Sequence, residues 1–325
     1  MKSIWREIIM AVIMSMILPG ITVNWAVEGE RPRFVEPQPE ETVPQPTTPA
    51  ARLEMKLRKS DGTVETMDMD NYLVGVILAE LPSTFEAEAK KAQAVAARTY
   101  ARKAFVTGGK HGDGSVCANS ACCQAWISRE TYLKKGGSER AVEQAAAAVS
   151  ATSGYVLTYG GMLIEATYFS CSGGSTEDAV AVWGTDFPYL RSVDSPGEEH
   201  AIYHTDTVRF TKEEFCAKLE LKLNGAPKSW IGTATYTAGD GISTMVIGGR
   251  TFSGTELRAK LGLRSTAFSM EADEEGILVT THGFGHRVGL SQYGADAMAM
   301  AGHSWQEILT YYYTGATLEL TNVPG

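Results

Sequence analysis

A single carboxylate at the end of an apolar run is the first feature that points to chemistry. The stretch NYLVGVILAELP at residues 71–82 predicts a helix that its proline ends, with Glu80 in the last turn. The same helical face carries the aliphatic side chains of Leu73, Val76 and Ile77. Loss of water and the negative end of the helix dipole both disfavour a charged carboxylate, so we expect a raised pKa for Glu80. A carboxyl group that keeps its proton near neutral pH can act as a general acid.

An ordinary role for Glu80 fits the same residues. A solvated glutamate at a helix end, paired with a nearby cation such as Arg98, has this pattern too. Most glycosidases also need two carboxylates that flank the bond they cleave. No second acid stands out, because Glu86 and Glu88 fall on a surface-like helical turn. The residue types alone leave both roles open.

Four metal-ligating side chains crowd into one loop: His111, Cys117, Cys122 and Cys123. One nitrogen and three thiolates suit a closed tetrahedral zinc site. Five cysteines cannot all pair with one another, and the alternative to zinc is a disulfide from Cys117 to Cys122 or Cys123. Cys171 and Cys216 lie elsewhere and are expected to be small buried residues.

The elements that position these residues begin with a hairpin. Residues 52–58 alternate like a strand, and the turn signal DG at 61–62 leads into a second strand over 63–67. Asp70 is expected to cap the helix that carries the acid.

Two further helices are expected, one before and one after the loop of metal-ligating residues. The pattern STFE at 83–86 predicts a capping box and a helix from Thr84 to about Phe105. A third helix is expected from Ser138 to Gly154. Two strands, over 155–159 and 162–169, follow as a second hairpin.

The rest of the chain contains a segment that we interpret as an inserted lobe, at about 205–265. Within it, a capping box at 211–214 opens a helix that ends near 224–225. Strands return near Phe268 and Ile277, and two helices close the chain, the last opened by a box at 304–307. We therefore predict an α+β fold of helices and antiparallel strands, with a central groove and a smaller inserted lobe.

The N-terminus predicts export. Residues 8–27 carry no charge and are long enough to span a bilayer as a helix, so 1–27 is interpreted as a membrane anchor, with a cleaved signal peptide as the alternative. Residues 28–50 are proline-rich and predict an extended spacer. The folded part, 51–325, is then extracytoplasmic, held at the cell membrane by a single span.

The charge balance argues against one class of partner. The net charge is −9, and there is no block of basic residues. Nucleic acid is therefore not expected as a partner, because phosphate binding depends on clustered Lys and Arg.

Three blocks of the sequence, in order, resemble one family: YLVGVILAELPSTFEAEAKKAQAVAARTYA, YFSCSGGSTEDAVAVWGTDFPYLRSV and HGFGHRVGLSQYGA. They resemble the stage II sporulation protein D family, to which amidase-enhancer proteins are related, and the resemblance spans about 52–320. It implies a lytic transglycosylase of peptidoglycan that acts in septal wall remodelling and engulfment during endospore formation. The acid of the family's ExP motif falls on Glu80.

The chemistry that the resemblance implies needs only one acid. Glu80 protonates the oxygen that links N-acetylmuramic acid to N-acetylglucosamine. Its carboxylate then helps the C6 hydroxyl of the muramic acid attack C1. The product is a 1,6-anhydro sugar, no water is consumed, and no cofactor is required for catalysis.

The resemblance also implies that polar groups surround the sugar. The candidate substrate-binding residues are Gln93, Arg98, Ser170, Ser172, Gly173, Ser291, Gln292 and Tyr293. For each polar side chain, a local cap or turn hydrogen bond is the alternative to substrate contact. Ser291 in particular can cap the helix that follows it.

The family also bears on the cysteine-rich loop. Some members carry a His-x5-Cys-x4-His-Cys zinc cluster, and the spacing here is the same with Cys122 in place of the second histidine. The resemblance thus implies a structural zinc ion. After His286 the family usually has glycine, whereas Arg287 stands here. His282 and His286 are not expected to bind a metal, because glycines separate them.

The implied partners are peptidoglycan glycan strands stripped of their stem peptides, a cell-wall amidase, and membrane proteins of the engulfment complex. A different class of function is a non-catalytic, glycan-binding activator of an amidase. A third is a zinc or cysteine peptidase built on residues 111–123.

Overall fold

The computed structural model describes residues 53–321, which combine helices with largely antiparallel sheets. The predicted α+β class is therefore confirmed. The membrane helix predicted over 1–27 and the spacer over 28–50 lie outside the described residues. Within 53–321, no helix is both long and apolar enough to cross a membrane.

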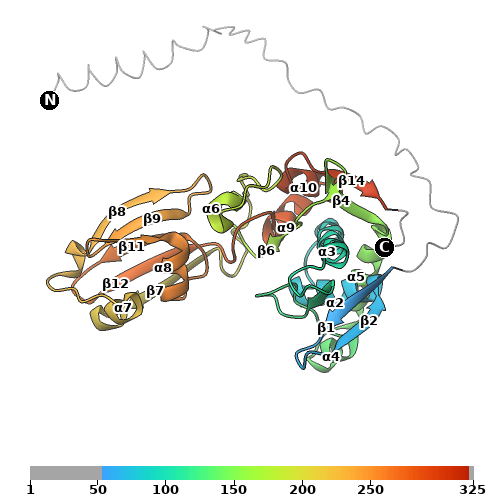
Figure 1. Ribbon diagram of the computed structural model, residues 1–325, viewed down its shortest axis with the longest axis horizontal. Helices are drawn as coiled ribbons and strands as arrows, with labels where there is room; N and C mark the ends of the chain where they lie inside the picture. Colours follow the sequence, from blue (N-terminus) through green and yellow to red (C-terminus); the bar gives the residue numbers. More distant parts are fainter. Residues whose placement is uncertain (1–52, 322–325) are drawn as a thin grey trace, which may run out of the picture. The chain divides into compact units, whose positions relative to one another are not determined.

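A first hydrophobic core is organised around α3. Its helices are α2 (Met69–Glu80), α3 (Ala87–Thr107), α5 (Glu139–Ala151), α9 (Gln292–Met300) and α10 (Trp305–Tyr312). Ala92, Ala94 and Ala97 of α3 are fully buried, and their small side chains let the other four helices pack closely against it. Figure 1 shows α2 and α5 beside α3. Two short helices, α4 (Arg129–Lys134) and α6 (Ala179–Trp183), complete this part.

Small sheets border the first core. Their strands are β1 (Glu54–Arg58), β2 (Val64–Asp68), β3 (Ser115–Cys117), β4 (Tyr155–Tyr159), β5 (Met162–Leu163), β6 (Tyr168–Phe169), β13 (Leu290–Ser291) and β14 (Thr317–Leu320). They pair in the orders β2-β1-β3, β14-β4-β5 and β13-β6. The hairpin predicted at 61–62 is confirmed by the antiparallel pairing of β1 with β2. The strand predicted over 162–169 is instead two strands, because β5 pairs with β4 while β6 pairs with β13.

A second hydrophobic core is formed by side chains from the part of the sequence between Phe210 and Val279. Its elements are β7 (Thr205–Phe210), α7 (Lys212–Leu219), the 3-10 helix η1 (Pro227–Ser229), β8 (Ile231–Tyr236), β9 (Ile242–Ile247), β10 (Arg250–Ser253), α8 (Gly254–Leu261), β11 (Ala267–Ala272) and β12 (Ile277–His282). The strands form the sheets β11-β12-β7 and β10-β9-β8, which Figure 1 shows gathered with α7 and α8. The strands predicted near Phe268 and Ile277 are β11 and β12.

Two of the predicted helix starts differ from the structure. Asp68, not Asp70, caps α2 by accepting from the Asn71 amide at 3.0 Å. The capping box predicted at 83–86 is wrong, because Glu86 caps α3 without a side-chain hydrogen bond, and its own amide donates to Asp296 instead.

The predicted capping boxes at 211–214 and 304–307 are confirmed. The helix opened by the first box is shorter than predicted. It ends at Leu219, and Glu220 follows with a φ of 57°.

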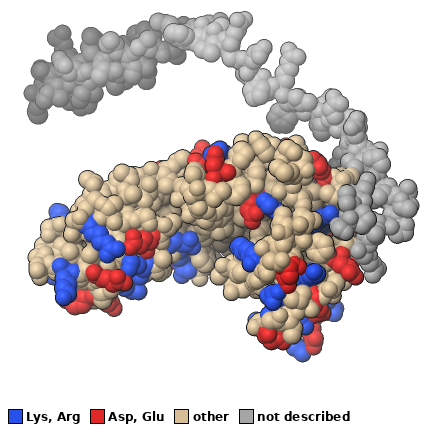
Figure 2. Space-filling view, viewed as in Figure 1, with Lys and Arg blue, Asp and Glu red and all other residues tan. Residues whose placement is uncertain are grey.

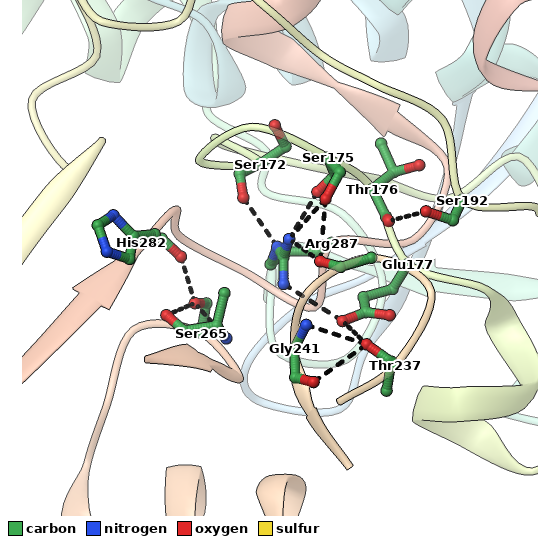
Figure 3. A network of polar contacts seen from close by, with 12 residues as sticks. Ser172, Ser175, Thr176, Glu177, Ser192, Thr237, Gly241, Ser265, His282 and Arg287 are labelled. Carbon is green, nitrogen blue, oxygen red and sulfur yellow. Dashed lines mark hydrogen bonds and ion pairs between the residues drawn. The ribbon is translucent and has the colours of Figure 1, made fainter. Parts of the chain in front are cut away.

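A buried ion pair connects the two cores at Arg287. This residue has a φ of 64°, in the left-handed region that glycine adopts most easily, and its side chain is fully buried. Its guanidinium lies 3.2 Å from Glu177 and donates to the carbonyls of Ser172, Ser175 and Gly239 (Figure 3). Gly239 belongs to the turn between β8 and β9, so Arg287 ties the second core to the loop that follows β6. These contacts offset the backbone strain of an arginine in a glycine-like conformation.

We expect Arg287→Ala to destabilise the fold strongly. It would leave the buried Glu177 carboxylate without its cation, which costs about 3–5 kcal/mol of the free energy of unfolding. Urea denaturation measures this loss. The control is Arg250→Ala, which removes an exposed ion pair with Glu256 and should cost less than about 1 kcal/mol. Similar losses for the two variants would contradict the structural role of Arg287.

Candidate active site

A cavity of about 810 Å³ opens beside Glu80. Its wall combines the end of α2, the cysteine-rich loop, the segment around β6, and residues 284–286. Gln292 at the start of α9 and Arg258 of α8 also line it, so both cores contribute side chains. Distant segments of the chain therefore meet at the predicted acid.

Glu80 is half-buried, and two donors hold its carboxyl group. The Ala125 amide donates to Oε1 at 2.6 Å, and the Gln292 side-chain amide donates to Oε2 at 3.2 Å. Burial raises the pKa of Glu80, while these two hydrogen bonds oppose the rise. The direction agrees with the sequence prediction, and the predicted aliphatic face is buried at Leu73, Val76 and Ile77.

The alternative pairing of Glu80 with Arg98 does not occur. Arg98 is 1% exposed and donates to the carbonyls of Val149 and Thr152 at the end of α5 and of Tyr155 at the start of β4. Its nearest acid is Asp70, at 3.8 Å. Arg98 is thus a structural residue that binds orphan carbonyls at a helix end.

One other carboxylate lines the cavity among the described residues, that of Glu165. Its Oε2 lies 3.1 Å from Nζ of Lys103. This ion pair engages the carboxylate of Glu165 with a cation of α3. No sequence pattern marks Glu165 as a cavity residue.

Two buried phenols lie near Glu80. Burial raises the pKa of both Tyr72 and Tyr168, and the charge of Glu80 raises them further. Tyr72 donates to the Gln124 side chain at 2.6 Å, and the hydroxyl of Tyr168 is buried. Both phenols therefore remain protonated and keep the surroundings of Glu80 poorly solvated.

Aromatic rings form another part of the wall. Trp183 and His286 lie with ring centroids 5.3 Å apart, and Phe169 packs on His286 at 5.7 Å. Burial lowers the pKa of His286 to about 4, so the imidazole is neutral at physiological pH. Such a wall, apolar with a few polar groups, is typical of ligand sites. No local pattern marks Trp183 as a cavity residue, because only the fold brings α6 to the same cavity as Glu80.

The structure places only two of the eight predicted substrate-binding residues on the cavity wall. These are Ser170 and Gln292. Arg98 binds backbone carbonyls, as described above, and Gln93 is 1% exposed inside α3. Contact of these two residues with a substrate is therefore not supported by the geometry.

The other four predicted contacts have local structural roles. Ser291 caps α9 by accepting from the Gly294 amide, which was the alternative considered for it. Ser172 is fully buried, and Gly173 has a φ of 73° where a Cβ would meet the backbone of Gly283 at 2.5 Å. The ring of Tyr293 packs edge-on against Phe85.

The four metal-ligating side chains converge as predicted. The ligand atoms of His111, Cys117, Cys122 and Cys123 all lie within 4.8 Å of one another, and all five cysteines are free thiols. The Cys122 and Cys123 sulfurs are 3.8 Å apart, and the Cys123 sulfur is 3.5 Å from His111 Nε2. Tetrahedral zinc with Zn–S bonds of about 2.3 Å requires sulfurs about 3.8 Å apart. The cluster therefore fits zinc and does not form the alternative disulfide.

The metal-ligating loop leads directly to the acid. Gln124 follows Cys123, is buried, and contacts Tyr72 of α2 and the Ala97 carbonyl of α3. The next residue, Ala125, supplies the amide that donates to Glu80. The conformation of this loop thus determines the position of one of the two hydrogen-bond donors to Glu80.

Cys171 is unsuited to nucleophilic chemistry. It is fully buried, as predicted, and donates to Glu198 at 3.0 Å. Burial and the neighbouring Glu198 carboxylate raise the pKa of the thiol, so it does not ionise. Cys216 is only partly buried and packs against the second core.

The surface charges are mixed. On the face drawn in Figure 2, Lys and Arg side chains are interspersed with Asp and Glu side chains. This distribution agrees with the charge balance of the sequence and gives phosphate no basic track on that face.

Comparisons with known proteins find similarity to stage II sporulation proteins and to an amidase enhancer. A family model described as stage II sporulation protein matches residues 58–159. The chain is 40% identical over 266 residues to the stage II sporulation protein D of Bacillus subtilis (strain 168), across 80% of this chain and 77% of that protein. It is 38% identical over 266 residues to the protein of the same name from Bacillus amyloliquefaciens, with the same shares. It is also 30% identical over 303 residues to an amidase enhancer of Bacillus subtilis (strain 168), across 76% of this chain but 40% of that protein.

Proposed function

The chain belongs to the stage II sporulation protein D family, and on this premise we propose that it is a lytic transglycosylase of peptidoglycan. Membership supports a role in the cell wall during sporulation. The observation that carries the enzymatic proposal is the carboxyl group of Glu80, which has a raised pKa and lines a large cavity. The other carboxylate on that wall, Glu165, is paired with Lys103.

The residues around Glu80 suit a reaction with one acid. Protonated Glu80 gives its proton to the oxygen between C1 of N-acetylmuramic acid and C4 of N-acetylglucosamine as the C1–O bond breaks. The donors from Ala125 and Gln292 then stabilise the carboxylate that remains. This carboxylate takes the proton of the C6 hydroxyl while that oxygen bonds to C1. The acid is restored, and a 1,6-anhydro ring replaces the product of hydrolysis.

We also assign the cluster of His111, Cys117, Cys122 and Cys123 to a structural zinc ion. Four protein ligands close the coordination sphere, and a closed site supplies folding energy and no catalytic water. These four ligand residues, when bound to the ion, would hold in place the loop that carries the Ala125 amide. A peptidase built on this cluster is disfavoured, because catalytic zinc sites keep one position open.

The proposed place of action is the outer side of the cell membrane during engulfment, with the N-terminal segment as anchor. The proposed substrate is a glycan strand stripped of stem peptides, so an amidase would act before this protein. The similarity to a protein named amidase enhancer supports a link to an amidase.

The products of digestion test the enzymatic proposal. The full-length protein is incubated with purified glycan strands, and the fragments are analysed by mass spectrometry. We expect ends that carry 1,6-anhydro-N-acetylmuramic acid, lighter by one water than hydrolysis products. Strands of unchanged length would overturn the proposal.

The second candidate function is a non-catalytic activator of a cell-wall amidase. The relative named amidase enhancer favours it. An activator alone raises the release of stem peptides by an added amidase and produces no anhydro ends. The same spectra therefore distinguish the two functions.

The pH dependence follows from the raised pKa of Glu80. The acid is active only when protonated, so the rate should stay high from low pH and fall as the pH rises through the raised pKa. We expect this fall at a pH above the ordinary pKa of a glutamate. Initial rates of anhydro product between pH 4 and pH 9, roughly the span around the carboxyl and imidazole pKa values, measure it. A fall at the ordinary value of a free glutamate would contradict the proposed environment.

A further inference from the structure

The carboxylate of Glu198 is buried and does not line the cavity. The side chain is 1% exposed and accepts five hydrogen bonds. The donors are the Cys171 thiol at 3.0 Å, the Ser172 amide at 2.6 Å, the Gly173 amide at 3.1 Å, the Ser195 hydroxyl at 2.5 Å and the Ser291 hydroxyl at 2.7 Å. One carboxylate thus joins the loop after β6 to the start of α9.

A short chain of contacts leads from Glu198 to the acid. The Ser291 hydroxyl donates to Glu198 and accepts from the Gly294 amide, so it fixes the first turn of α9. Gln292 is the first residue of that helix, and its side-chain amide donates to Glu80 at 3.2 Å. The backbone of Ser291 is also paired with Phe169 of β6. The position of the Gln292 donor is therefore set by Ser291 and, through it, by Glu198.

We propose that Glu198 is a positioning residue, which holds Ser291 and the start of α9 so that Gln292 donates to Glu80. The effect of Glu198 on the reaction rate rests on the proposed transglycosylase function. Glu198 itself does not touch the substrate, because it does not line the cavity. The carboxylate is required because it offers only acceptors to five donors. A glutamine there would turn an NH₂ group toward some of those donors.

The variant Glu198→Gln tests the proposal at nearly constant volume. We expect kcat for anhydro product to fall about tenfold, which is about 1.4 kcal/mol, with KM within about twofold, since the lost donor stabilises the carboxylate formed in the reaction. The matched control is Glu199→Gln, which removes the same charge from the exposed neighbouring residue and should leave both constants unchanged.

A second readout does not depend on activity. Glutamine side-chain amides are labelled with ¹⁵N in the full-length protein, and the Gln292 signal is identified by its loss in Gln292→Ala, made in the wild-type and in the Glu198→Gln background. In the wild type the Gln292 amide protons should exchange slowly with water. In Glu198→Gln they should exchange about tenfold faster and shift, while Glu199→Gln matches the wild type.

The outcomes separate this proposal from the proposed function. If the wild type makes no anhydro product, the function fails and the amide signal still decides the role of Glu198. If Glu198→Gln does not fold, Ser291→Ala cuts the same link with the carboxylate in place, and the same changes are expected. A folded variant of either kind with wild-type exchange at Gln292, or with kcat as in Glu199→Gln, would overturn the proposal.

Discussion

Glu80→Gln should lower the rate of anhydro product formation by about 10²–10⁴-fold, the usual contribution of a general acid. Glutamine keeps the size of the side chain and an oxygen that can accept from the Ala125 amide, but it has no proton to give. Initial rates on purified glycan strands measure the loss. Unchanged rates in this variant would remove Glu80 from the mechanism.

The stability of Glu80→Gln separates a lost proton donor from a lost fold. Burial raises the pKa of Glu80 in the folded state, so the stability that the protonated group contributes is lost as the pH rises through this pKa. Glutamine stays neutral at every pH. The variant should therefore melt at the wild-type temperature in acid and slightly higher above the raised pKa. Glu165→Gln is the matched control on the same cavity wall, and it should lower the rate less than about tenfold, since the acid is already paired with Lys103.

Removal of the proposed zinc ion is expected to have the second large effect. A chelator, or Cys123→Ser, takes away a closed site and with it the order of the loop that carries Ala125. We expect the melting temperature to fall by more than about 5 °C and anhydro product to fall at least about tenfold. Metal analysis, calorimetry and digestion follow the three quantities.

The control for metal removal lies in the same chain. Cys216→Ser changes a thiol that packs against the second core, away from the cluster, and should retain both metal and activity. A purified protein that contains no metal, and whose melting temperature stays the same when a chelator is added, would refute the structural site.

Sequence patterns predicted local features well where the signal is local. The capping boxes at 211–214 and 304–307 form because the two reciprocal hydrogen bonds depend only on neighbouring residues. The convergence of the metal-ligating cluster and the apolar face of Glu80 also follow from spacing within one segment. The box at 83–86 failed because the Glu86 amide has a distant partner, Asp296, which no local pattern contains.

The remainder of the candidate site depends on contacts between distant segments. Arg98 and Ser172 are polar residues in the matching blocks, yet both are buried. Arg98 donates to the carbonyl of Thr152, and the backbone amide of Ser172 donates to the Glu198 side chain. Conversely, Trp183 and Glu198 carry no local signal. Only the fold brings Trp183 to the cavity wall and Glu198 within hydrogen-bond distance of Ser291. Arg287 is a middle case. Its unusual position was visible in the sequence, but the buried partner that accounts for it, Glu177, was not.

The central claim is that Glu80 is a neutral acid when the glycan arrives. Its titration can be followed directly by ¹³C NMR of the labelled side-chain carboxyl group, with Glu80→Gln to identify the signal. The account predicts a pKa above the ordinary value of glutamate in the folded protein. A carboxyl group that titrates at or below that ordinary value would contradict it.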